Sequence, residues 1–256
     1  MPDELPTTPS FRLDGRRAVV TGAGRGIGRA AAAALAQAGA EVTLVARTAY
    51  DLHEVAEELR ASGATVATEC LDVTDVVAVQ QFFARQSAFH ILVNNAGTNR
   101  PLSMLDVTED DYDAVLDLNL KAMFFVAQAA ARRMIEEEIA GSMIHMGSQM
   151  GHVGGVRRSL YCASKWGLEG MNKAFALDLA PHRIRSNTIA PTFIETPMTR
   201  PFLADSSFMA SVMSKIKLGR LGQVEDLMGA IVFLAGDASS LMTGASLVID
   251  GGWTAD

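Results

Sequence analysis

The sequence predicts an α/β fold, a single doubly wound parallel sheet of seven strands with helices on both faces. Short runs rich in β-branched residues alternate with longer amphipathic segments along most of the chain. The short runs are apolar nearly throughout, as in strands that are buried on both faces. A length of 256 residues also suits one α/β domain.

Three strand and helix pairs form the first part of the chain. Gly22 ends the first strand, and Gly39 and Gly63 end the first two helices. The expected pairs are 17–22 (RAVVTG) with 25–39, 41–47 (EVTLVAR) with 49–63, and 64–73 with 75–86.

The same alternation continues to the end of the chain, which makes the fold Rossmann-like. The helix near 111–137 begins with Thr108 and Asp111 in the spacing of a capping box. We expect one domain over residues 1–256, with an N-terminal extension at 1–11 and a long loop at 192–217 that forms a lid. The remaining expected strands are 90–97, 142–148, 184–191 and 245–250, and the remaining helices are 111–137, 159–179, 201–217 and 224–235.

Composition excludes several classes of function. The net charge of -7 and the absence of a basic block argue against nucleic-acid and anionic-membrane surfaces. No apolar run approaches the roughly 20 residues of a membrane span, and the first 15 residues do not resemble a secretory signal. Cys70 and Cys162 are isolated, as expected for reduced thiols in a cytoplasmic protein. The five histidines lack metal-ligand spacing, so we expect no metal.

A glycine-rich turn, TGAGRGIG, joins the first strand to the first helix. Gly22 permits a tight turn, Gly26 lets backbone N–H groups approach a pyrophosphate, and Gly28 lets helix and strand pack closely. The positive end of the helix dipole then faces the anion. In the first βα unit of a doubly wound sheet, this turn predicts a dinucleotide site.

The end of the second strand indicates which dinucleotide binds. Ala46 stands where an acidic residue would bind the ribose of NAD, and Arg47 follows it. Arg25 lies within the glycine turn. Two guanidinium groups without a competing carboxylate suit the 2′-phosphate of NADP. NAD remains possible, as does the alternative that both arginines are solvated surface residues.

Tyr161 and Lys165 are four residues apart in an expected helix and therefore share one of its faces. Taken alone, this spacing is more typical of a surface tyrosine beside a solvated lysine. Together with the other motifs, the chain from about residue 12 to 253 resembles the short-chain dehydrogenase/reductase family. The motifs that carry the resemblance are TGAGRGIG, LDVT at 71–74, NNAG at 94–97, Asn119, Ser148, Tyr161-x-x-x-Lys165 and IDGGW at 249–253.

The resemblance implies an NAD(P)-dependent enzyme that acts on CH-OH groups, with Asn119, Ser148, Tyr161 and Lys165 as catalytic residues. Tyr161 would be the general acid/base, with its pKa lowered by Lys165. Ser148 would hydrogen-bond the reacting oxygen, and Asn119 would hold a water of a proton relay. The implied cofactor contacts are Gly22, Arg25, Gly26, Ile27, Gly28, Arg47, Asp72, Val73, Asn94, Ala96, Gly97, Tyr161, Lys165, Pro191, Ile194 and Thr196.

The family usually has Pro-Gly where this chain has Pro191-Thr192, so a β-branched side chain is expected beside the nicotinamide. A small-molecule substrate would bind at the strand ends and the lid. Resemblance also implies a homotetramer that packs through the helices at 111–137 and 159–179. The candidate substrate contacts are Thr98, Gln149, Met150, His152, Thr192 and Phe202.

Three functions remain open. The C-terminal stretch 219–253 resembles sugar and polyol dehydrogenases of the glucose or gluconate type. A 3-oxoacyl-[acyl-carrier-protein] reductase would usually have a basic docking residue where this acidic chain has Leu177. The third function is that of a non-catalytic nucleotide-binding protein, although such proteins typically lose the tyrosine or the lysine.

Overall fold

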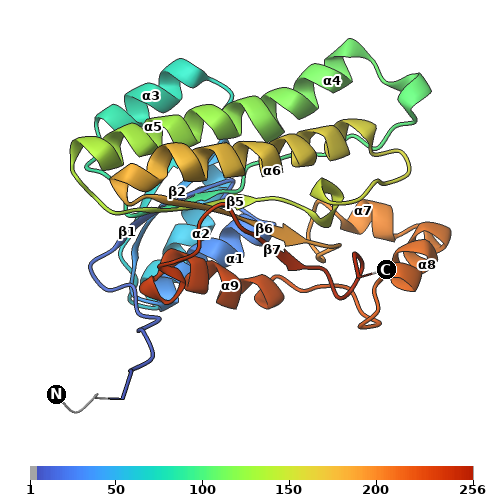
Figure 1. Ribbon diagram of the computed structural model, residues 1–256. Helices are drawn as coiled ribbons and strands as arrows, with labels where there is room; N and C mark the ends of the chain where they lie inside the picture. The colour runs from blue at the N-terminus through green and yellow to red at the C-terminus, as the bar shows by residue number, and fades with distance from the viewer. Residues whose placement is uncertain (1–4, 256) are drawn as a thin grey trace.

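The computed structural model describes residues 5–255 and is built on a seven-stranded parallel sheet (Figure 1). The strand order is β3-β2-β1-β4-β5-β6-β7, which confirms the predicted doubly wound sheet. The strands are β1 (Arg17–Thr21), β2 (Glu41–Ala46), β3 (Val66–Cys70), β4 (Ile91–Asn94), β5 (Ser142–Met146), β6 (Arg185–Pro191) and β7 (Ser246–Ile249).

Helices cover both faces of the sheet, as the sequence predicts. In Figure 1, α3 to α6 form one layer and α1, α2 and α9 form the other, while α7 and α8 lie beside the ends of β6 and β7. The helices are α1 (Gly26–Gln37), α2 (Ala49–Ala61), α3 (Val76–Ala84), α4 (Glu109–Leu116), α5 (Met123–Glu136), α6 (Ser159–Leu179), α7 (Arg200–Leu203), α8 (Ser206–Lys215) and α9 (Glu225–Ala235).

The strands send alternate side chains into two hydrophobic cores. In β1, Val19 belongs to the core beneath α3 and α5, whereas Val20 belongs to the core beneath α1, α2 and α9. Met143 and Ile144 of β5 divide in the same way. Because both faces are buried, strands such as β1 and β4 are apolar at nearly every position, which explains the continuous apolar runs there. The edge strand β3 is largely exposed, and β6 begins with polar residues at 185–188.

The long helix predicted at 111–137 begins earlier and contains an irregularity. Thr108 and Asp111 form the predicted capping box, so α4 starts at Glu109. A π-helical segment, η2 (Asp117–Ala122), separates α4 from α5. The whole stretch Glu109–Glu136 is long and apolar enough to cross a membrane by length and composition. Half of its most apolar window is buried within the protein.

Other predictions differ from the structure in detail or lie partly outside it. The segment at 201–217 forms two helices, α7 and α8, rather than one. The N-terminal extension at 1–11 falls partly outside the described residues, and its described part, 5–11, is exposed and has no regular structure. Cys70 and Cys162 are free thiols. Among residues 5–255 we find no group of three His, Cys, Asp or Glu side chains that could hold a metal ion.

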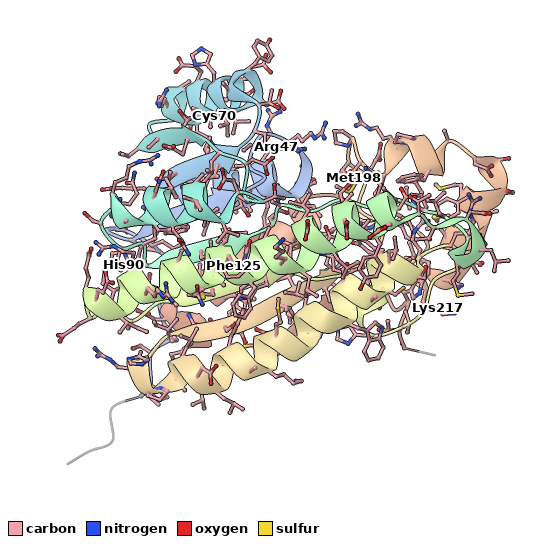
Figure 2. All side chains as sticks on the ribbon, turned by 90° about the horizontal axis from the view of Figure 1, so that it is seen from above. Arg47, Cys70, His90, Phe125, Met198 and Lys217 are labelled. Atoms are coloured by element: carbon pink, nitrogen blue, oxygen red, sulfur yellow. The ribbon has the colours of Figure 1, made fainter. Side chains whose placement is uncertain are left out.

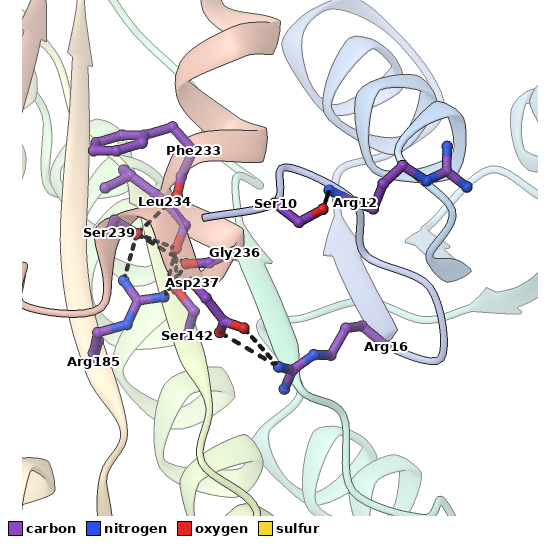
Figure 3. A network of polar contacts seen from close by, with 10 residues as sticks. All are labelled: Ser10, Arg12, Arg16, Ser142, Arg185, Phe233, Leu234, Gly236, Asp237 and Ser239. Carbon is purple, nitrogen blue, oxygen red and sulfur yellow. Dashed lines mark hydrogen bonds and ion pairs between the residues drawn. The ribbon is translucent and has the colours of Figure 1, made fainter. Parts of the chain in front are cut away.

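A network of hydrogen bonds connects the C-terminal end of α9 to strand β6 of the sheet (Figure 3). Arg185 of β6 donates hydrogen bonds to the carbonyl oxygens of Leu234 (2.9 Å) and Gly236 (3.1 Å), at the C-terminal end of α9. It also donates to the Ser239 hydroxyl at 2.9 Å. A cation at the C-terminus of a helix satisfies carbonyls that have no partner within the helix and opposes the negative end of its dipole.

We expect Arg185→Met to lower the free energy of unfolding by about 1.5–3 kcal/mol, because it removes hydrogen bonds from a charged, partly buried donor. Arg16→Met is the matched control. Its ion pair with Asp237 is 3.4 Å long and exposed, so its loss should cost less than about 1 kcal/mol. Urea denaturation at one fixed protein concentration would measure both. Equal losses would show that α9 does not depend on Arg185.

Candidate active site

The carboxyl ends of the strands enclose a cavity of about 310 Å³. It lies where the strand order reverses between β1 and β4, the position at which open α/β sheets bind ligands. Figure 2 shows Arg47 and Met198 toward the same edge of the molecule, and both line the cavity. The predicted site residues that line it are Gly22, Arg25, Gly26, Ile27, Arg47, Asp72, Val73, Ala96, Gly97, Thr98, Ser148, Tyr161, Lys165, Pro191, Thr192, Ile194 and Thr196.

The glycine turn forms one wall of this cavity. Gly22 and Gly26 have φ angles of +66° and +55°, which glycine adopts without strain. A Cβ atom at Gly28 would lie 2.2 Å from the carbonyl oxygen of Gly22, so only glycine permits this contact between helix and strand. Gly28 itself does not line the cavity, because it faces β1. Its role is therefore to set the position of α1.

The N-terminus of α1 is open to an anion. No side chain caps this 12-residue helix, and its first turn contains no acidic residue. Gly26 and Ile27 of that turn line the cavity. The first N–H groups of a helix have no partner within the helix, and they sit at the positive end of its dipole. The residues present therefore fit the pyrophosphate of a dinucleotide.

Both predicted arginines lie at this end of the cavity, and carboxylates accompany them. Arg47 Nη1 is 3.7 Å from Asp72 Oδ2, and 71% of the Arg47 side chain is exposed. Asp51, in the first turn of α2, also lines the cavity. The expectation of arginines without a competing carboxylate is therefore wrong for this region. Arg47 and Arg25 remain exposed enough to meet a phosphate.

Ser148, Tyr161 and Lys165 line another part of the same cavity. Ser148 follows β5, and its hydroxyl donates to Gln149 Oε1 at 2.8 Å. Lys165 is one turn beyond Tyr161 on α6, and its Nζ lies 5.6 Å from the centre of the Tyr161 ring. The same Nζ donates to the carbonyl oxygen of Met146 at 2.7 Å. The structure thus brings together three of the four predicted catalytic side chains.

The electrostatics of Tyr161 differ from the sequence prediction. Burial raises the pKa of Tyr161, and this effect is only partly opposed by hydrogen bonding with Ser148 and by the positive charge of Arg158. Burial also lowers the pKa of Lys165 to about 8, although the carboxylate of Glu169 opposes the shift. The prediction that Lys165 lowers the Tyr161 pKa overlooked both the cost of burial and the charge of Arg158.

Asn119, the fourth predicted catalytic residue, lies behind the cavity wall within the π-helical segment η2. Its Oδ1 accepts from the backbone N–H of Thr98 at 2.8 Å, and its Nδ2 donates to the Thr98 carbonyl at 2.9 Å. Nδ2 also donates to the Ser164 hydroxyl at 3.1 Å. The side chain therefore joins the loop after β4 to α6, directly beside Lys165.

Several predicted contacts do not line the cavity. Asn94 is buried and donates to the Met123 carbonyl at 2.8 Å, so its neighbour Asn95 lines the cavity instead. His152 is paired with the Ser246 hydroxyl at 3.0 Å and lies 3.7 Å from Glu169 Oε1. The predicted residues outside the lining are Gly28, Asn94, Asn119, Gln149, Met150, His152 and Phe202.

Other residues of the cavity are not evident from the sequence. Asp51 belongs to a helix that carries no recognisable motif, and Asn95 is indistinguishable from Asn94 in the motif NNAG. The Thr192 hydroxyl oxygen is buried and has no hydrogen-bond partner among residues 5–255. A lining residue with an unsatisfied buried hydroxyl is suited to bind a polar group of a ligand. The unassigned lining residues include Gly24, Thr48, Asp51, Asn95, Gly147, Pro197 and Thr199.

Comparison with known proteins gives one consistent result. A family model described as Enoyl-(Acyl carrier protein) reductase matches residues 22–254. D-erythrulose reductase of Gallus gallus is 38% identical over 245 residues, which are 96% of this chain and 98% of that protein.

Two solved structures have nearly the same fold. A short-chain type dehydrogenase/reductase from Mycobacterium marinum is 38% identical and superimposes with a TM-score of 0.91 over 96% of this chain and 98% of its own. A gluconate 5-dehydrogenase from Burkholderia cenocepacia J2315, in complex with NADP and tartrate, is 36% identical with a TM-score of 0.91, again over 96% and 98%. This chain belongs to the short-chain dehydrogenase/reductase family.

Proposed function

We propose that this protein is an NADP-dependent oxidoreductase that interconverts a secondary alcohol and a carbonyl on a sugar, sugar acid or polyol. The proposal rests on one observation above all. A single cavity is lined by the uncapped N-terminus of α1, by Arg25 before that helix and Arg47 after β2, and by Ser148, Tyr161 and Lys165. A site for the coenzyme pyrophosphate and a proton donor in the same cavity are what hydride transfer from a dinucleotide to a carbonyl compound requires.

The choice of NADP over NAD rests on Arg25 and Arg47. A guanidinium group binds a phosphate through paired, charge-assisted hydrogen bonds. The presence of NADP in the related gluconate 5-dehydrogenase supports this choice. Asp51 and Asp72 at the same end of the cavity reduce the net positive charge there, so NAD also remains possible.

The proton chemistry belongs to this chain's own side chains. When it is bound, NADP supplies or takes up the hydride at the substrate carbon. Tyr161 gives its hydroxyl proton to the carbonyl oxygen during reduction and takes a proton from the alcohol during oxidation. Ser148 can turn its hydroxyl from Gln149 to the same oxygen, and the Lys165 ammonium stabilises the tyrosinate.

Asn119 acts as a positioning residue in this proposal. Its amide uses both its oxygen and its nitrogen on Thr98 and Ser164. Ser164 also donates to the Tyr161 carbonyl at 2.8 Å, so Asn119 fixes the turn of α6 that carries the tyrosine and the lysine. The proton relay through a water at Asn119 stays a prediction.

The substrate class follows from polar groups on the cavity wall. Thr192 offers a buried hydroxyl without a partner among residues 5–255, and Thr98 also lines the cavity. A site built to pair with hydroxyl groups rejects compounds that lack them. The relatives named D-erythrulose reductase and gluconate 5-dehydrogenase support this class. An acidic acyl-carrier protein is a less suitable partner. The exposed position where such reductases usually have a basic docking residue is occupied by Leu177, and the whole chain has a net charge of -7.

We propose a single domain in which the segment 192–217, with α7 and α8, closes over the substrate. Tyr112 on α4 and Trp166 and Leu177 on α6 are large exposed apolar residues, which supports a homotetramer that packs through these helices. The free thiols of Cys70 and Cys162 support a cytoplasmic location.

The first test of the function is a substrate panel. With NADP(H), we expect aldoses, sugar acids or polyols to have a higher kcat/KM than acetoacetyl thioesters. Tyr161→Phe should lower kcat on the best substrate at least about 100-fold, because it removes the acid/base. Its NADPH affinity, measured by fluorescence titration, should be unchanged.

Tyr112→Phe is the matched control, because Tyr112 is 53% exposed on α4 and should tolerate loss of its hydroxyl. A higher kcat/KM for the thioesters would identify the acyl-carrier reductase instead. NADPH binding without turnover of any compound would identify a non-catalytic nucleotide-binding protein.

The second test addresses the coenzyme. Arg47→Ala should weaken NADP binding about tenfold, the lower end of the range for hydrogen bonds to charged groups, because its side chain is largely exposed. NAD binding should barely change. Arg29→Ala is the control, because Arg29 pairs with Glu58 on the surface and does not line the cavity. An equal loss for NADP and NAD would remove Arg47 from 2′-phosphate recognition.

The third test uses pH. Lys165 has a lowered pKa of about 8, so it is charged below that pH and neutral above it. Lys165→Met should shift the onset of alcohol oxidation to higher pH, because the tyrosinate loses its cation. The difference in kcat between Lys165→Met and wild type should become smaller above pH 8, where Lys165 of the wild type is also neutral.

Profiles of kcat from pH 6 to 10 at saturating NADP would measure this shift. Lys173→Met on the exposed side of the same helix should leave the profile unchanged. A constant difference between Lys165→Met and wild type at every pH would contradict titration of Lys165 in this range.

A further inference from the structure

Arg158, the residue before α6, has a guanidinium group that is buried without a carboxylate partner. The residue is only 5% exposed. Among residues 5–255, the buried Asp, Glu, Lys and Arg side chains are those of Arg158, Lys165, Glu169 and Asp250. Glu169 and Asp250 accept several hydrogen bonds, and Lys165 has both the Met146 carbonyl and the nearby charge of Glu169.

The positive charge of Arg158 is balanced by far fewer hydrogen bonds and by no ion pair among the described residues. A guanidinium has five N–H donors, and in the described part of the chain the Arg158 group makes one hydrogen bond, from Nη1 to the Arg157 carbonyl at 3.2 Å. No acidic side chain forms an ion pair with it there. A buried charge is costly unless it is paired, so this arrangement calls for an anion from outside the chain.

Aromatic rings hold the guanidinium in place but do not neutralise it. The Arg158 guanidinium carbon lies 5.5 Å from the ring centre of Phe202 on α7 and 5.7 Å from that of Phe208 on α8. Such contacts stabilise a cation through the ring faces. They leave the N–H groups at the guanidinium edge free to bind a planar anion through two parallel hydrogen bonds.

The Arg158 guanidinium lies near the end of the cavity that contains Tyr161. The charge of Arg158 lies close enough to Tyr161 to lower the pKa of its hydroxyl. Phe202 and Phe208 belong to the lid segment 192–217. Arg158 lies three residues before Tyr161 and against two rings of the lid segment, although neither Arg158 nor these rings line the cavity. A substrate anion in the cavity would reach the guanidinium only if the lid segment moves.

We propose that Arg158 binds the carboxylate of a sugar-acid substrate and so makes the enzyme prefer sugar acids to neutral sugars and polyols. This inference rests on the proposed function and narrows its substrate class. A carboxylate matches the guanidinium in charge and in planar geometry. A neutral hydroxyl group would leave the buried charge uncompensated.

The test compares substrates that differ in the group at one end of the carbon chain. D-gluconate, D-gluconamide and D-glucitol share a six-carbon polyol chain, and only D-gluconate is an anion. Wild type with NADP should have a kcat/KM at least about tenfold higher for D-gluconate than for the other two, because a charged hydrogen-bonded pair is lost with them. This comparison needs no variant, so it holds even if substitution of Arg158 prevents folding.

Arg158→Gln should then lower kcat/KM for D-gluconate roughly 10- to 100-fold, mainly through KM. Any effect on kcat through the Tyr161 pKa is common to all three substrates and cancels in their ratio. Arg158→Lys keeps the charge without the paired donors and should retain part of the preference. Arg157→Gln is the matched control, since Arg157 is exposed and its loss changes the net charge equally.

The outcomes separate this inference from the proposed function. If wild type oxidises none of the three compounds and none of a wider panel of sugars, sugar acids and polyols, the proposed function is wrong and this inference falls with it. If wild type uses them without preference for the anion, or if Arg158→Gln lowers kcat/KM for all three alike, only this inference is overturned. The role of Arg158 would then be to hold the lid segment through its contacts with Phe202 and Phe208.

Discussion

The contact between β1, β4 and α1 is the constraint on which the rest of the site depends. The Thr21 hydroxyl accepts from the backbone N–H groups of Asn95 (2.9 Å) and Ala96 (3.1 Å), and Asn95 Nδ2 donates to the Thr21 carbonyl at 3.0 Å. Gly28 packs so close to Gly22 that no side chain fits between them. These contacts fix the start of α1 relative to the sheet, and thereby the position of its free N–H groups in the cavity.

The sequence predicts the framework because burial on both faces of the sheet forces a simple pattern. Apolar runs mark most strands, although β3 and the first half of β6 are polar, and glycines mark the turn at Gly22 and Gly26, where positive φ angles are required. The catalytic side chains could be predicted because they follow motifs at fixed positions. The positions of Asp51 and Arg158 could not be predicted, because their surroundings are formed by elements that are distant in the sequence. The π-helical segment around Asn119 leaves no recognisable mark in the sequence either.

His152 illustrates how a local interpretation can miss a tertiary partner. Its place after β5 suggests a substrate contact, but its imidazole is paired with Ser246 beside the buried carboxylate of Glu169. Glu169 also accepts from the Thr188 hydroxyl at 2.9 Å and keeps the pKa of Lys165 from falling further. This group of polar side chains therefore supports the charge of Lys165 from behind the active site.

The distribution of charge connects the two ends of the cavity. The whole chain has a net charge of -7, yet Arg25, Arg47 and Lys165 line one cavity, where Asp51 and Asp72 offset only part of their charge, and Arg158 lies buried near Tyr161. Positive groups gathered in a cleft with low-dielectric walls focus their field there and attract anions, while the acidic surface repels them elsewhere. An anionic coenzyme is attracted by one end of this field. If the substrate is also an anion, as we propose from Arg158, the same field would guide both reactants to a single site.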